Sequence, residues 1–206
     1  DPQSFNFIVT GTGYSNFSLT DAAAAKDQTL VPGTYSVSET AVAGWDLTSS
    51  VCSDGSPITA IALAAGETVT CTFTNTKRGH IIVDKVTDPS GDPQSFNFTV
   101  SGTGYSNFSL TDAGAANDQT LAPGTYSVSE TAVAGWELTS SVCSGGSPIS
   151  AIALAAGETV TCTSTNTKRG HIIVDKITIP SGDPQNFSFV AGGSGYANFN
   201  LTDAAA

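Results

Sequence analysis

The chain has 206 residues and is acidic, with 18 Asp and Glu side chains against 7 Lys and Arg and a formal net charge of −11. This balance argues against binding to nucleic acid, whose phosphates require basic patches, and against anionic membrane surfaces. It favours a soluble surface that resists self-association.

The sequence repeats itself with a period of 91 residues. The heptapeptide that begins at Asp1 returns at Asp92 and, with substitutions, at Asp183. The segments 1–77 and 92–168 align without a gap and differ at nine positions. Because one period is long enough to bury a core, each repeat is predicted to form one small domain.

These boundaries divide the chain into three predicted parts. Residues 1–77 form a first repeat without its first strand, residues 78–168 form a complete repeat, and residues 169–206 form the N-terminal part of a third. No signal peptide, membrane span or wall-sorting tail is recognisable. We therefore expect the sequence to be a section of a longer array.

The complete repeat shows alternating runs rich in Val, Ile, Thr, Phe and Tyr, separated by turns of Gly, Pro, Asp and Asn. No run has a helical period. The expected strands are, in chain order, 80–87, 95–101, 105–111, 119–121, 125–132, 136–143, 149–154 and 159–167. About seven short strands with regular turns predict an all-β, immunoglobulin-like sandwich. The short junction at 167–171 predicts stiff coupling of successive domains in a rod or filament.

The four cysteines obey the repeat. Cys52 and Cys71 recur as Cys143 and Cys162, and the partners of each pair are separated by 19 in sequence number. Two cysteines in a domain favour one disulfide each and an oxidising compartment, with two buried thiols as the alternative. The spacing fits no zinc motif, so neither a metal nor a cofactor is expected.

Three rows of inward-facing side chains each end in a polar residue. Because side chains alternate across a strand, residues that share a face can be identified from the sequence. The rows are Ile81, Val83 and Lys85; Tyr126, Val128 and Glu130; and Val160, Cys162, Ser164 and Asn166. Buried Lys and Glu are rare unless they are paired, so these three exceptions suggest one common cause.

A chemical reaction among Lys85, Glu130 and Asn166 would explain why these three polar residues face inward. Burial lowers the pKa of a lysine and raises that of a glutamic acid, which leaves a nucleophilic amine and a proton donor. The amine of Lys85 could then attack the side-chain amide of Asn166 while Glu130 transfers protons, releasing ammonia and leaving an isopeptide bond. The alternative is a buried Lys–Glu ion pair with Asn166 capping a strand end, without a covalent bond.

The motifs of the repeat resemble a known family. They are Gly-x-Ile-x-Val-x-Lys at 79–85, Leu-x-Pro-Gly-Thr-Tyr-x-Val-x-Glu-Thr at 121–131, Gly-Trp at 135–136 and Thr-Asn-Thr at 165–167. In this order they resemble the prealbumin-like (transthyretin-like) domains of bacterial surface proteins, such as the B-type repeats of collagen adhesins and the pilin domains of Gram-positive pili. The resemblance implies a Lys85–Asn166 isopeptide bond assisted by Glu130.

This repeat also departs from that family. Residues 132–136 read Ala-Val-Ala-Gly-Trp where the family often has Ala-Pro-x-Gly-Tyr, and a cysteine pair is not typical of pilin domains. The change from Phe73 in the first repeat to Ser164 in the second is also expected to loosen the core beside Asn166.

Outside the complete repeat, the same positions form half-sites. Glu39 and Asn75 have no lysine in their segment, whereas Lys176 has no glutamate or asparagine. Either the partners lie in further parts of the same chain, or a neighbouring subunit supplies them by strand donation. Residues 183–206 repeat what 1–24 already provide, which speaks against the simplest form of donation.

Together these patterns predict a secreted or cell-surface structural protein, the subunit or stalk of an extracellular pilus-like filament or adhesin, whose partner is itself. Its lysine chemistry is a single-turnover reaction, so no enzymatic activity on an external substrate is expected. The alternative is a surface module that binds a host protein or glycan. A binding assay against glycans and matrix proteins would separate the two.

Overall fold

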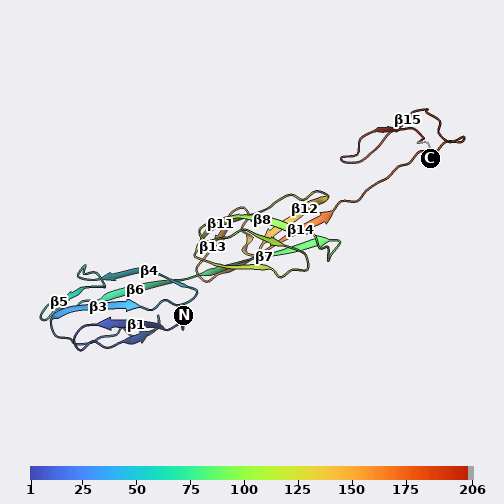
Figure 1. The fold of residues 1–206 in the computed structure, drawn as a ribbon. Helices are drawn as coiled ribbons and strands as arrows, with labels where there is room; N and C mark the ends of the chain where they lie inside the picture. Colours follow the sequence, from blue (N-terminus) through green and yellow to red (C-terminus); the bar gives the residue numbers. More distant parts are fainter. Residues whose placement is uncertain (204–206) are drawn as a thin grey trace. The chain divides into compact units, whose positions relative to one another are not determined.

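The computed structural model describes residues 1–203 and divides the chain into two compact units, residues 1–168 and residues from Arg169 onward (Figure 1). Within the described residues, the single helical element is the short 3₁₀ turn η1 (Ser144–Gly146). No helix there is long and apolar enough to cross a membrane.

Residues 79–168 form a sandwich of two four-stranded sheets, as predicted. One sheet contains β7 (Gly79–Asp88), β10 (Asn117–Leu121), β12 (Trp136–Cys143) and β14 (Thr159–Lys168), in the order β10-β7-β14-β12. The other contains β8 (Phe96–Ser101), β9 (Phe108–Leu110), β11 (Gly124–Glu130) and β13 (Ile152–Leu154), in the order β13-β11-β8-β9. Their inner faces enclose one apolar core.

The first and last strands of this domain, β7 and β14, lie side by side and run parallel (Figure 1). The other edge of β7 pairs antiparallel with β10, so β7 is a central strand. Its side chains alternate between the core and the outer face, and Ile81 and Val83 are both 0% exposed. Lys85 continues this inward row because alternate residues of a strand share one face.

Two expected strands are shorter than predicted because turns replace their first residues. The strand expected over 105–111 is β9, Phe108–Leu110, because Tyr105 closes a turn by donating its backbone N–H to Gly102. The strand expected over 149–154 is β13, Ile152–Leu154, because Ala151 donates to Pro148 in another turn. The remaining strands deviate by two residues or fewer from their predicted ends, a normal uncertainty for strand termini.

Residues 1–77 form only part of the same sandwich. One complete sheet contains β1 (Phe5–Thr10), β2 (Phe17–Leu19), β3 (Gly33–Glu39) and β5 (Ile61–Leu63), in the order β2-β1-β3-β5. The second sheet consists of β4 (Trp45–Cys52) and β6 (Cys71–Lys77) alone. The segment 26–30, which corresponds to β10, forms no strand here.

The core of this part is correspondingly open. Its buried apolar residues are Phe7, Tyr35, Val37 and Ile61, whereas the other core positions are only partly buried. Trp45 is partly exposed, although its counterpart Trp136 is 8% exposed. Because the second sheet here has no equivalents of β7 and β10, apolar surface that the complete domain buries is exposed.

The second unit contains a hairpin of β15 (Phe187–Phe189) and β16 (Phe199–Leu201), which pair antiparallel. The segment that corresponds to β7, residues 170–179, forms no strand. Ile172, Ile173 and Ile179 are 75%, 90% and 99% exposed. No strand pairs with this segment among the described residues, and its exposed isoleucines therefore lack the burial that is favourable for apolar side chains.

Candidate functional site

The three polar residues singled out by their strand positions meet in the core of residues 79–168. Lys85 comes from β7, Glu130 from the end of β11 and Asn166 from β14. The Lys85 Nζ lies 3.9 Å from the Glu130 Oε2, and the Asn166 Nδ2 donates a 2.6 Å hydrogen bond to the Glu130 Oε1. The side chains of Lys85 and Glu130 are 0% and 3% exposed. Glu130 thus bridges the amine and the amide from the opposite sheet.

The hydrogen bonding of this cluster is incomplete. The Lys85 Nζ donates to the backbone carbonyls of Val86, at 2.7 Å, and Ser164, at 3.1 Å. The Glu130 Oε2 and the Asn166 Oδ1 are buried without a hydrogen-bond partner. A buried unsatisfied polar atom costs about 1–3 kcal/mol. Both atoms belong to the residues that face the lysine, and the Glu130 Oε2 is the one that lies 3.9 Å from the Lys85 Nζ.

Aromatic rings shield the amine from water. The Phe96 ring centroid lies 4.3 Å from the Lys85 Nζ, and Trp136 packs edge-on against Phe96 at 5.4 Å. Phe96 is itself 0% exposed. These rings cover the side of the lysine that its polar neighbours leave open.

Burial shifts both titratable groups toward their neutral forms. Desolvation lowers the pKa of the Lys85 amine, and the opposing charge of Glu130 reduces this shift. Desolvation raises the pKa of the Glu130 carboxyl, opposed by the hydrogen bond from Asn166 and the charge of Lys85. One proton transfer from the ammonium to the carboxylate therefore yields a nucleophilic amine beside a carboxylic acid.

The half-sites keep the local geometry of the complete site. In the first repeat, the Asn75 Nδ2 donates to the Glu39 Oε2 at 2.8 Å. In the second unit, the Lys176 Nζ donates to the carbonyl of its neighbour Ile177 and lies 4.2 Å from the Phe187 ring centroid, as Lys85 does with Val86 and Phe96. The described structure brings no lysine to Glu39 and Asn75.

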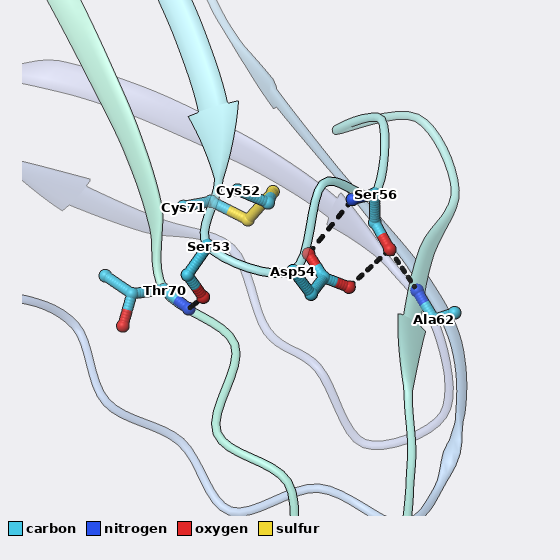
Figure 2. Close-up of a disulfide and its surroundings, with 7 residues drawn as sticks. All are labelled: Cys52, Ser53, Asp54, Ser56, Ala62, Thr70 and Cys71. Atoms are coloured by element: carbon cyan, nitrogen blue, oxygen red, sulfur yellow. Dashed lines mark hydrogen bonds between the residues drawn. A yellow bond between two sulfur atoms is a disulfide. The ribbon is translucent and has the colours of Figure 1, made fainter.

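Both predicted disulfides are present, Cys52–Cys71 and Cys143–Cys162, and no cysteine is free. Each joins two neighbouring antiparallel strands, β4 to β6 and β12 to β14. Figure 2 shows the first bond beside a small hydrogen-bonded loop, in which Thr70 donates its N–H to the Ser53 Oγ and Ser56 donates its N–H to Asp54. The disulfide thus joins β4 to β6, the strand that carries Asn75.

The sequence pattern did not single out two residues that support the site. Phe96, which covers the lysine, belongs to the repeated heptapeptide, and nothing in the sequence pattern connects it to Lys85. Asp112 accepts backbone N–H bonds from Thr87, at 2.6 Å, and from Gly91, and so holds the end of β7 beyond Lys85. The recurrence of this aspartate as Asp21 and Asp203 is the signal that could have identified it.

Among residues 1–203, no group of three or more His, Cys, Asp or Glu side chains could hold a metal ion.

The sequence matches the family described as the prealbumin-like fold domain over residues 1–77 and 81–168. This chain belongs to that family. The two matched regions contain both disulfides and every residue of the Lys85 cluster. No match to a curated protein was found.

Several solved structures are similar to this prealbumin-like chain. The major pilin T-13 of Streptococcus pyogenes has 13% identity and a TM-score of 0.31, covering 80% of this chain and 89% of the pilin. A C-terminal fragment of the pilus adhesin SpaC from Lactobacillus rhamnosus GG has 17% identity and a TM-score of 0.33, covering 83% and 90%. The open conformation of SpaC has 13% identity and a TM-score of 0.34, with 82% of this chain and 29% of SpaC covered.

Proposed function

We propose that this prealbumin-like chain is a structural subunit or stalk of an extracellular fibre, in a pilus-like filament or a cell-surface adhesin. In this role its complete domain carries a Lys85–Asn166 isopeptide bond. The observation that supports the proposal is the buried cluster of Lys85, Glu130 and Asn166, which links the first and last strands of a repeated domain. A covalent bond at this point would join the two ends of each domain directly.

The bond would form in one step of condensation within the folded core. The neutral amine of Lys85 attacks the side-chain amide carbon of Asn166, a C–N bond forms to the lysine, and the bond to Nδ2 breaks. Glu130 accepts a proton from the attacking nitrogen and delivers one to the leaving nitrogen, which departs as ammonia. Burial of the three side chains supplies the high effective concentration that such a reaction needs.

The position of the bond suits a fibre under tension. A pull on the chain acts on β7 at one end of the domain and on β14 at the other, and these strands are adjacent and parallel. An isopeptide between them carries the force through a covalent link rather than through the sheets. The reaction occurs once for each domain, so it is no turnover of an external substrate.

Two disulfides in this chain support an extracellular location, because such bonds persist in oxidising compartments. The near-identical repeats and the short junction between them favour self-association into a rod of head-to-tail domains. The acidic charge keeps the outer surface soluble.

The test is the intact mass of the 206-residue chain, measured after reduction and denaturation. We expect a deficit of one ammonia, and a cross-linked peptide pair containing Lys85 and Asn166 after proteolysis. The variant Glu130→Gln should abolish this link while retaining the Cys143–Cys162 disulfide, which reports that the domain has folded. The matched variant Glu39→Gln, at the same position of the first repeat, should leave the link intact.

A chain of full mass with no Lys85–Asn166 peptide pair would reject the isopeptide. The domain would then be a disulfide-bonded module whose lysine and glutamate form a buried ion pair. A Glu130→Gln variant that still forms the link at an unchanged rate would reject the proton-transfer role of Glu130.

A further inference from the structure

The peptide group between Val86 and Thr87 lies next to the buried lysine and is hydrogen-bonded on both sides. Its carbonyl accepts a 2.7 Å hydrogen bond from the Lys85 Nζ. Its N–H donates a 2.6 Å hydrogen bond to the Asp112 Oδ1. Asp112 and the amine of Lys85 are therefore connected through a single peptide group, in the order carboxylate, N–H, carbonyl and amine.

Asp112 is itself held in place. It follows β9, and its Oδ2 accepts the backbone N–H of Gly91 from the turn after β7. The N–H groups of Gly91 and Thr87 stabilise the carboxylate and so lower the pKa of Asp112 below its ordinary value. Asp112 therefore remains a charged acceptor, and hydrogen bonds to a charged acceptor are stronger than those between neutral groups.

Thr87 is fixed as well, so the peptide group has little freedom to rotate. Thr87 is 2% exposed, and its hydroxyl donates a 2.9 Å hydrogen bond to the Pro89 carbonyl. Together with the bond from its N–H to Asp112, this contact sets the direction in which the Val86 carbonyl points.

The Lys85 amine contacts two backbone carbonyls. The second is that of Ser164 on β14, at 3.1 Å from the Nζ. A neutral amine has two hydrogens to donate, so the carbonyls of Val86 and Ser164 can engage both of them. The lone pair must then point away from both carbonyls. Its direction, on which attack depends, is therefore set by two fixed backbone groups.

The same arrangement occurs in the second unit of the structure. There the Lys176 Nζ donates to the Ile177 carbonyl at 2.6 Å, and the Thr178 N–H donates to the Asp203 Oδ2 at 3.1 Å. These residues stand one 91-residue period after their counterparts. The connection from carboxylate through peptide group to amine is therefore a feature of the repeat and is not peculiar to one copy.

We propose that Asp112 is a positioning residue for the formation of the Lys85–Asn166 bond and that it acts through the 86–87 peptide group. This inference rests on the isopeptide reaction proposed above. Asp112 neither gains nor loses a proton in it, so the bonds formed and broken are those already given, and ammonia remains the leaving group.

The contribution of Asp112 is geometric. Burial lowers the pKa of Lys85, and the charges of Glu130 and Asp112 both oppose that shift, so Asp112 does not activate the amine through its charge. Instead it fixes the Val86 carbonyl and strengthens it as an acceptor, because hydrogen bonds in a chain polarise one another. The amine is thereby held 3.9 Å from the Glu130 Oε2. A displacement of about 1 Å can slow such a reaction roughly a hundredfold.

The test compares rates of bond formation in the 206-residue chain, made by cell-free translation in an oxidising mixture. Samples are denatured at timed intervals, and intact mass gives the fraction of chains that have lost one ammonia. The Cys143–Cys162 disulfide, measured in the same samples, identifies the chains that have folded.

We expect Asp112→Ala to slow bond formation among folded chains by roughly tenfold to a hundredfold. Asp112→Asn keeps an oxygen that can accept the Thr87 N–H, and should restore at least most of the parent rate. Asp203→Ala, the same change one period later, is the control and should leave the rate of the Lys85–Asn166 bond unchanged.

A second change tests the peptide group directly and does not require Asp112→Ala to fold. Cell-free translation can place the α-hydroxy acid of threonine at position 87, which replaces the N–H by an ester oxygen and leaves the Gly91 bond intact. We expect this ester to slow the reaction about as much as Asp112→Ala. The two changes together should be no slower than either alone, because both interrupt one connection. The same ester at position 178 is the matched control.

A spectroscopic measurement reports on the lysine without the reaction. In an Asn166→Ala background, which cannot form the bond, the ¹³C resonance of the Lys85 Cε should shift when Asp112→Ala is added. Adding Asp203→Ala should leave this resonance unchanged.

An Asp112→Ala chain or a position-87 ester that reacts at the parent rate overturns the positioning role, even though the isopeptide forms. Additive effects of the two changes overturn the path through the peptide group. A parent chain that never loses ammonia rejects the isopeptide itself, and the Lys85 resonance then decides alone whether Asp112 positions the amine.

Discussion

At the scale of single residues, burial decides the chemistry of the complete domain. Lys85 is held among Phe96, Glu130 and two backbone carbonyls, so that desolvation lowers its pKa and raises that of Glu130. The same residue types on a solvated face would form an ordinary ion pair with little energetic consequence. The reactivity that we propose for this site therefore depends on the packing around the lysine.

Tyr105 is a second buried group with a measurable consequence. Its hydroxyl has no hydrogen-bond partner, and burial raises the pKa of Tyr105 to about 12 from the ordinary value of 10.0. Between these values the unfolded chain has lost a proton that the folded domain keeps, so the free energy of unfolding falls as pH rises. Two pKa units correspond to roughly 3 kcal/mol at most.

We expect Tyr105→Phe to abolish this alkaline loss and to leave stability near neutral pH unchanged or slightly higher. Urea unfolding at neutral and at alkaline pH, monitored by Trp136 fluorescence in a Trp45→Phe background, would measure the free energy of unfolding under both conditions. Tyr14→Phe, at the same position of the first repeat, is the control and should not change the Trp136 transition. An equal alkaline slope in the Tyr105→Phe and parent chains would contradict the assignment.

At the scale of elements, β14 is held on both sides. The disulfide attaches it to β12, and the proposed isopeptide attaches it to β7. A 19-residue separation between Cys143 and Cys162 predicts a stabilisation of roughly 3 kcal/mol from loop-closure entropy. The disulfide loop lies within the segment that the isopeptide would close, so the two links restrain overlapping parts of the unfolded chain.

We therefore expect the double variant Cys143→Ala and Cys162→Ala to cost about 3 kcal/mol in a Glu130→Gln background, where the isopeptide is absent. The cost should be smaller in the parent chain, because part of that entropy is already lost. Denaturant unfolding of the four variants in a thermodynamic cycle provides the comparison. Equal costs in both backgrounds would show that the two links act independently.

At the scale of the whole molecule, the tandem repeats would make the proposed isopeptide link of each domain a mechanical property of the proposed fibre. The isopeptide would enclose the residues between Lys85 and Asn166, 81 positions apart, and exclude them from any extension under force. The disulfide Cys143–Cys162 lies within that loop, and its 19-residue separation stays closed under force even when the isopeptide is absent. A pulled chain would therefore extend very little through its complete domain.

Single-molecule pulling of the 206-residue chain under oxidising conditions tests this. Loss of the isopeptide in Glu130→Gln should release about 62 residues, or roughly 200 Å at 3.3–3.6 Å for each residue. The parent chain should lack this step. The Glu39→Gln variant, at the equivalent position of the first repeat, is the control. A step of roughly 200 Å in the parent chain would refute the proposed Lys85–Asn166 isopeptide bond.

Much of the fold could be read from the sequence because its signals are local and periodic. Alternation predicted the strands and placed Lys85, Glu130 and Asn166 on inward faces, and the repeat paired the cysteines. The covering ring of Phe96 and the anchoring carboxylate of Asp112 were missed, because their roles depend on contacts between distant strands.

Neighbouring strands in the tertiary structure decide whether a given segment forms a strand. Residues 27–30 and 118–121 have the same sequence, Asp-Gln-Thr-Leu, yet only the second copy forms a strand, because only there does β7 supply a hydrogen-bonding edge. The identical residues 80–85 and 171–176 differ in the same way: the first copy is a central strand and the second is unpaired. The sequence by itself determined the alternating pattern and the chemistry of each face. The backbone bonds and the apolar burial that complete a strand come from neighbours in space, so the tertiary structure alone decided where they are satisfied.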